Sequence, residues 1–122
     1  MSCLFIALAK QSGEKRSHQL IRSLICDYLS DDNELGKVGK ASDVVMWESG
    51  TKLANYVAKM RLPSTWGGAI EISAWCNITG CKIHVYDVRK SQSLITEFIP
   101  SSDTNHEKTI RLQWSGGHYE PL

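Results

Sequence analysis

The apolar residues of this chain change their spacing about two thirds of the way along it, and this change limits the folds it can adopt. Before Gly80, apolar side chains recur every three or four positions, as at Leu20, Leu24 and Tyr28, which is the spacing of an amphipathic helix. After Gly80, short runs of β-branched and aromatic residues predict strands. Helices followed by strands predict an α+β fold, with helices packed around a small, mostly antiparallel sheet. The predicted strands cover residues 82–88, 94–99 and 109–114.

Four helices are predicted before the strands. The first follows Ser2 and ends near Gly13, the second begins after Ser17, the third ends before Pro63, and the fourth runs from a Trp-Gly-Gly turn to Gly80. Residues 34–40 are polar and rich in glycine, so they are expected to form a loop. Trp47 and Trp75 are expected to pack in the core.

Composition places the chain among small globular proteins. It has 122 residues, 42% of them hydrophobic, which fits a single domain over residues 1–122. The net charge of +1 and the scattered Lys and Arg residues argue against a nucleic-acid partner. The longest apolar run, residues 4–9, is far shorter than the roughly 20 residues of a membrane span. We therefore expect a soluble, monomeric, cytoplasmic protein without membrane contact.

The four cysteines allow two disulfides, but reduced thiols are expected in an intracellular chain of this size. Cys76 and Cys81 lack the spacing of a zinc knuckle, so buried structural thiols are the preferred interpretation and no metal site is predicted.

The candidate chemistry lies near the two ends of the chain. Cys3 would occupy the first turn of a helix, where unsatisfied amides favour a thiolate. His118 offers a base, and Glu120 lies two residues later, on the same side of an extended segment. The alternatives are a core thiol for Cys3, a solvated His118 and an exposed charge for Glu120.

Four blocks of sequence link these residues, because they resemble the ovarian tumour (OTU) family of cysteine proteases. Residues 3–9 resemble the nucleophile helix of that family, and residues 66–74 resemble its Trp-Gly-Gly turn with the following helix. Residues 81–87 are similar to its central strand, and His118-Tyr119-Glu120 resembles its closing His-aromatic-acid signature. The blocks span the whole chain in family order, and the compact length looks most like viral OTU domains.

The resemblance implies a papain-type thiol protease that cleaves after the C-terminal Gly-Gly of ubiquitin or a ubiquitin-like modifier. Cys3 would be the nucleophile, His118 the base and Glu120 the residue that orients His118, with no cofactor. Trp66, Gly67, Gly116 and Gly117 are candidates for a narrow substrate channel, because a missing Cβ lets two backbones approach closely. For Trp66 the alternative is a buried core tryptophan. A viral member would act in the host cytoplasm and blunt immune signalling.

The chain also departs from the family pattern. The family carries an Asp-Gly-Asn-type loop before its nucleophile, whereas only Met1 and Ser2 precede Cys3 here. Losing one oxyanion donor can lower a rate about a hundredfold to a thousandfold. Family members also more often have Asp or Asn at the position of Glu120. Two alternatives therefore stay open, a ubiquitin-binding module with little turnover and a protease that processes its own viral polyprotein.

Overall fold

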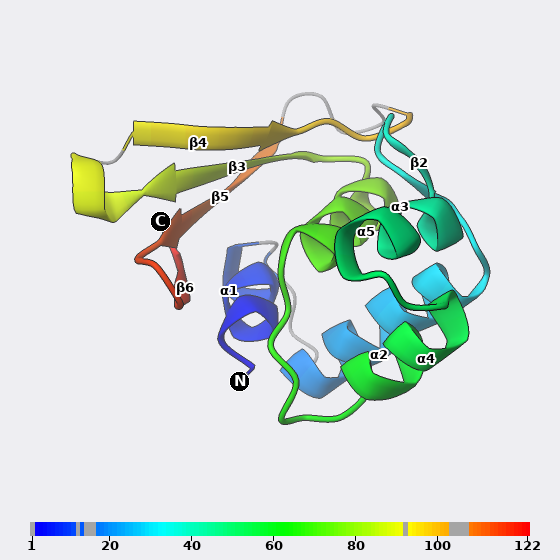
Figure 1. The fold of residues 1–122 in the computed structure, drawn as a ribbon. Helices are drawn as coiled ribbons and strands as arrows, with labels where there is room; N and C mark the ends of the chain where they lie inside the picture. The colour runs from blue at the N-terminus through cyan, green and yellow to red at the C-terminus, as the bar shows by residue number, and fades with distance from the viewer. Residues whose placement is uncertain (1, 12, 14–16, 92, 103–107) are drawn as a thin grey trace.

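The structure is a computed structural model that describes residues 2–11, 13, 17–91, 93–102 and 108–122. Its helices are α1 (Cys3–Gln11), α2 (His18–Ser30), α3 (Ala41–Ser49), α4 (Leu53–Met60) and α5 (Ala69–Thr79), with a short 3-10 helix η1 (Val88–Lys90). Its strands are β1 (Glu34–Leu35), β2 (Gly39–Lys40), β3 (Lys82–Asp87), β4 (Ser93–Phe98), β5 (Thr109–Trp114) and β6 (Tyr119–Pro121). The predicted α+β fold is confirmed (Figure 1).

The main sheet has four strands in the order β4-β3-β5-β6. Neighbouring strands pair antiparallel at β3–β4 and β5–β6, whereas β3 and β5 pair parallel. The chain therefore crosses over between β4 and β5. Figure 1 shows the helices gathered to one side of this sheet, with α1 beside β6.

The core forms where the helices meet the sheet. From α1, the side chains of Leu4, Phe5 and Leu8 are fully buried, and Ile83 and Ile110 on the sheet belong to the same core and are also fully buried. Burying an apolar side chain of this size stabilises a fold by about 1.5–3 kcal/mol. The nucleophile helix of the sequence prediction is thus held by core packing.

The structure corrects the sequence predictions between residues 34 and 49. Residues 34–40 form an antiparallel hairpin of β1 and β2, where a loop was expected. The helix α3 that follows was not predicted as a separate element. It buries Ala41, Val44 and Val45, which share one helical face. Trp47 lies off that face and is 67% exposed, so the prediction of a core Trp47 is wrong, whereas Trp75 is buried as expected.

None of the helices that the structure describes is long and apolar enough to cross a bilayer.

Candidate active site

Cys3 stands at the beginning of α1. The first helical hydrogen bond runs from the Ile6 amide to the Ser2 carbonyl at 2.9 Å. By helix geometry, the amides of the first turn have no acceptor within the helix, and they carry part of the positive end of the helix dipole. Leu4 and Phe5 anchor this turn in the core, while Cys3 stays half-buried. The thiol is therefore held in place at the first turn of the helix.

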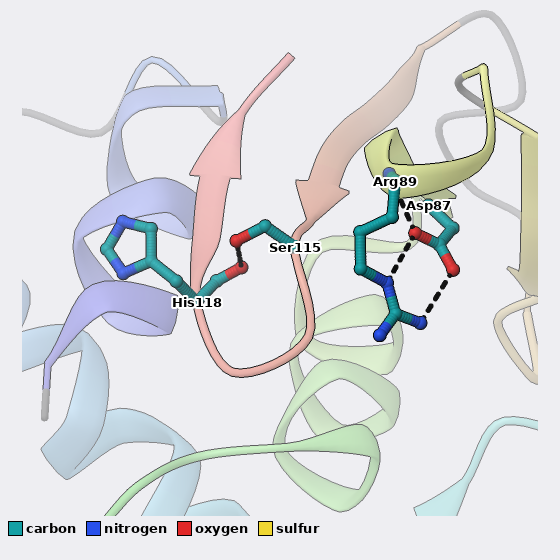
Figure 2. A network of polar contacts seen from close by, with 4 residues as sticks. All are labelled: Asp87, Arg89, Ser115 and His118. Atoms are coloured by element: carbon teal, nitrogen blue, oxygen red, sulfur yellow. Dashed lines mark hydrogen bonds and ion pairs between the residues drawn. The ribbon is translucent and has the colours of Figure 1, made fainter.

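His118 is the last residue of a tight turn between β5 and β6. The Ser115 amide donates to the His118 carbonyl oxygen at 3.1 Å, which closes the turn around Gly116 and Gly117. Figure 2 shows the His118 ring and the Ser115 side chain at the two ends of this turn. The predicted role of Gly116 and Gly117 as channel residues stays a prediction, and the structure places both at the exposed tip of the turn.

Glu120, on β6, lies on the same side of the chain as His118, which directly precedes the strand, as the period of two predicts. Its Oε1 atom is 3.2 Å from Nε2 of His118, and both side chains are more than half exposed. A carboxylate that holds one ring nitrogen fixes the orientation of the ring and leaves Nδ1 for another partner.

The three predicted catalytic residues line one cavity of about 440 Å³. Helix α1 and strand β6 are packed side by side, which brings the two ends of the chain together. Burial raises the pKa of Tyr119, and the neighbouring Cys3 and Glu71 add to this shift. The pair of Cys3 and His118 is thus assembled across more than a hundred residues of sequence. The other residues lining the cavity are Ser2, Ile6, Ala7, Lys10, Tyr119 and Pro121.

Trp66 and Gly67 line a second cavity, of about 570 Å³, between α4 and the start of α5. Trp66 is 54% exposed, so the alternative of a buried core tryptophan is wrong. A Cβ atom at Gly67 would lie 2.8 Å from Cδ2 of Leu4 and 3.0 Å from Cζ of Phe5. Glycine is therefore required here because the Trp-Gly-Gly turn presses against α1.

Glu71 holds the Trp-Gly-Gly turn. One carboxyl oxygen accepts a hydrogen bond from the Gly68 amide at 2.7 Å, and the other accepts from the Tyr56 hydroxyl at 2.6 Å. The residue is only 1% exposed, and this burial raises the pKa of its carboxyl to about 6.

Arg22 is a positioning element that the sequence predictions missed. Its guanidinium donates to the carbonyl oxygens of Met60 and Thr65 at 2.9 Å each and to the Ser2 hydroxyl at 3.3 Å. It also stacks on Phe5, with 4.2 Å between Cζ and the ring centroid. The sequence feature that could have identified Arg22 is its position as a single charged residue on the apolar face of α2, beside Ile21, Ile25 and Cys26.

His84 has an acidic partner that its spacing in the sequence does not reveal. Its Nε2 atom lies 2.8 Å from Oε2 of Glu97 on the neighbouring strand β4. Strand pairing brings these two residues together although they are thirteen positions apart in sequence.

Comparison with known proteins gives one family. The model of the OTU-like cysteine protease family matches residues 2–120. Ubiquitin thioesterase OTU1 of Drosophila pseudoobscura pseudoobscura is 28% identical over 99% of this chain and 31% of its own length. Ubiquitin thioesterase OTU1 of Mus musculus is 35% identical over 67% of this chain and 24% of its own length. The chain thus spans about a third of the length of the first of these relatives and about a quarter of the second.

Solved structures share the fold. An OTU domain in complex with ubiquitin superposes with a TM-score of 0.75 at 21% identity, covering 98% of this chain and 62% of that one. The Hazara virus OTU bound to ubiquitin gives a TM-score of 0.72 at 18% identity, covering 99% of this chain and 74% of that one.

Proposed function

The chain belongs to the family of OTU-like cysteine proteases, and on that premise we propose that it is a deubiquitinase. It would hydrolyse the peptide or isopeptide bond after the C-terminal Gly-Gly of ubiquitin or of a ubiquitin-like modifier. The observation that carries this proposal is the cavity shared by Cys3 and His118, with Glu120 3.2 Å from the far ring nitrogen of His118. The curated relatives are named as ubiquitin thioesterases, which supports ubiquitin as the substrate.

The reaction begins at the Cys3 thiol, with His118 as its base. Its sulfur attacks the scissile carbonyl carbon, and the thiol proton passes to His118. His118 then protonates the leaving amine as the C–N bond breaks, which leaves the carboxyl end of ubiquitin as a thioester on Cys3. A water molecule, deprotonated by His118, hydrolyses this thioester and releases the free enzyme. Glu120 keeps the His118 ring in the orientation that both proton transfers require.

The developing oxyanion needs donors close to Cys3. The Cys3 amide at the N-terminal turn of α1 lies before the first intrahelical hydrogen bond, and we propose it as one donor. The partial positive charge of the helix end stabilises the same anion.

The substrate tail would pass beside Trp66 and Gly67 on one wall and beside Gly116 and Gly117 on the other. The support is that Gly67 packs on the nucleophile helix and that Gly116 and Gly117 belong to the turn that ends at His118. Exposed Trp66 offers an apolar face to an extended peptide.

A ubiquitin with a thiol-reactive group at its C-terminus tests the proposal. We expect the wild-type protein to form a covalent adduct that Cys3→Ala abolishes and Cys26→Ala leaves intact. Cys26 is a suitable control because burial raises the pKa of its thiol to about 11, so it stays protonated. A protein that binds ubiquitin but forms no adduct would instead be a binding module, and the protease proposal would be abandoned.

We propose more specifically that the protein is viral and that it blunts host immunity. Several solved structures with this fold are viral OTU domains, which supports this proposal, whereas the curated relatives are animal and plant proteins. We also propose that the protein is located in the cytoplasm. Detection of the protein in fractionated cells, together with its ubiquitin conjugates, would test the location.

A further inference from the structure

Arg89 lies beside the turn that ends at His118, on an element that the proposed mechanism does not use. It belongs to η1, which directly follows β3, and its side chain reaches back toward the end of the sheet. Figure 2 shows Arg89 and Asp87 on one side of the turn and the His118 ring on the other.

Asp87 fixes the Arg89 side chain in one orientation. Its Oδ1 atom accepts hydrogen bonds from the backbone amide and Nε of Arg89 at 3.0 Å each, and its Oδ2 atom accepts from Nη2 at 2.9 Å. The Asp87 side chain is only 8% exposed. A two-pronged pair of this kind sets the plane of a guanidinium as well as its position. The same carboxylate caps η1, so one residue holds both the backbone and the side chain of Arg89.

The Arg89 guanidinium stacks on Trp114, which directly precedes the turn. Its Cζ atom lies 4.5 Å from the ring centroid of Trp114, the last residue of β5. Asp87 and Trp114 are partners in the parallel pairing of β3 with β5, so the sheet register itself brings Arg89 to this ring.

The guanidinium also lies close to Gly116 in the turn. A Cβ atom at Gly116 would lie 3.2 Å from Nη1 of Arg89, and Gly116 has a φ of +105°, which side-chain-bearing residues rarely adopt. Two consecutive glycines leave a turn with many accessible conformations. Contact with a rigid guanidinium removes some of them.

We propose that Arg89 is a positioning residue that holds the Ser115–His118 turn, and through it the His118 ring, in the arrangement that serves Cys3. The inference rests on the proposed function, because it assigns Arg89 a part in that reaction. Asp87 orients Arg89, Trp114 supplies the aromatic face, and Gly116 is the point of contact on the turn. The effect is on geometry, so it falls on turnover and leaves the affinity for ubiquitin unchanged.

Steady-state cleavage of a fluorogenic ubiquitin amide tests the inference. For Arg89→Ala we expect kcat to fall about fivefold, the size of one lost cation–π contact, while KM stays near the wild-type value. Arg89→Lys retains the charge but not the planar fork, so it should lose nearly as much turnover. Asp87→Asn weakens the pairing with the Arg89 guanidinium, so we expect kcat to fall by less than in Arg89→Ala. Arg111→Ala, an exposed arginine on β5, is the matched control and should behave as wild type.

Three outcomes would overturn the inference. The first is an Arg89→Ala variant with wild-type kcat, and the second is a rise in KM without a fall in kcat, which would make Arg89 a substrate contact. The third is full recovery in Arg89→Lys, which would make the charge and not the fork responsible. If Arg89→Ala melts at a lower temperature than wild type, kcat is compared instead between wild type and an Arg89→Lys variant of wild-type stability. A lower kcat in Arg89→Lys then supports the inference, and an unchanged kcat overturns it. A wild-type protein without Cys3-dependent cleavage would refute the proposed function itself, a result distinct from all of these.

Discussion

At the scale of single residues, Gly67 shows how tightly the cleft is packed. We expect Gly67→Ala to destabilise the protein by about 1–3 kcal/mol, because the new methyl group would lie 2.8 Å from Leu4 and 3.0 Å from Phe5 in the nucleophile helix. Both neighbours are fully buried, so they could make room only by repacking the core. Urea unfolding measures the loss.

Gly68→Ala is the matched control for this change. No atom lies within 4 Å of a Cβ at Gly68, so the same added methyl group should cost far less. Equal losses in the two variants would mean that the backbone of the turn, and not its contact with α1, requires glycine.

Glu120 is an exposed member of the candidate site, with 58% of its side chain accessible to solvent. We expect Glu120→Ala to lower kcat roughly tenfold, because the His118 ring loses the carboxylate that lies 3.2 Å from its Nε2 atom. Glu120→Gln keeps an acceptor oxygen at the same reach and should retain more activity than the alanine variant. Unchanged turnover in Glu120→Ala would remove this residue from the catalytic group.

At the scale of elements, the junction between α4 and α5 depends on one buried carboxyl. Because burial raises the pKa of Glu71 from 4.5 to about 6, the folded protein binds a proton there that the unfolded chain has released between these pH values. The contribution of Glu71 therefore favours folding at about pH 4.5 and is lost as the pH rises through 6. A shift of this size corresponds to about 2 kcal/mol.

The Glu71→Gln variant has no titrating group at this position, so it is the reference against which the effect of Glu71 is measured. We expect the free energy of unfolding of wild type, relative to Glu71→Gln, to be larger at pH 4.5 than at pH 6.5. Urea unfolding at several pH values measures this difference. Glu48→Gln, at an exposed position of α3, should show no such trend. A pH-independent difference between wild type and Glu71→Gln would mean that Glu71 has the same pKa in the folded and unfolded states.

Local patterns predicted the elements, and long-range pairing supplied the rest. The helices α2 and α5 and the strands β3 and β5 follow from apolar spacing and glycine stops, which are properties of neighbouring residues. The parallel pairing of β3 with β5 is set by packing across the whole chain, so strand patterns alone do not reveal it. The helix α3 went unpredicted because its apolar face is short and an exposed Trp47 obscures its period.

In the candidate site, too, some residues were predicted from the sequence and others were found only in the structure. Cys3, His118 and Glu120 were identified by the family resemblance, and the structure brings them to one cavity. Arg22 and Arg89 act through carbonyl groups, rings and a turn that are far away in sequence or reached only by the fold. No spacing rule detects such contacts, which is why both arginines emerged only from the structure.

At the scale of the whole molecule, the sheet has an edge whose side chains face solvent. Within the part of the chain that the structure describes, strand β4 pairs only with β3 in the main sheet, and Leu94 and Ile95 on it are each about half exposed. An exposed apolar edge strand invites pairing with a second chain. We therefore expect concentrated protein to associate through β4, and Leu94→Lys to reduce that association without lowering the melting temperature.

Light scattering across a range of protein concentrations measures the association. Leu62→Lys is the control, because Leu62 is equally exposed at 53% but follows α4 and belongs to no strand. If association depends on the β4 edge, only Leu94→Lys should shift its onset to higher concentration. Equal shifts in both variants would mean that total exposed apolar surface, and not the strand edge, drives association. The active-site cavity lies on α1 and β6, at the other edge of the sheet, so Leu94→Lys should leave ubiquitin cleavage unchanged.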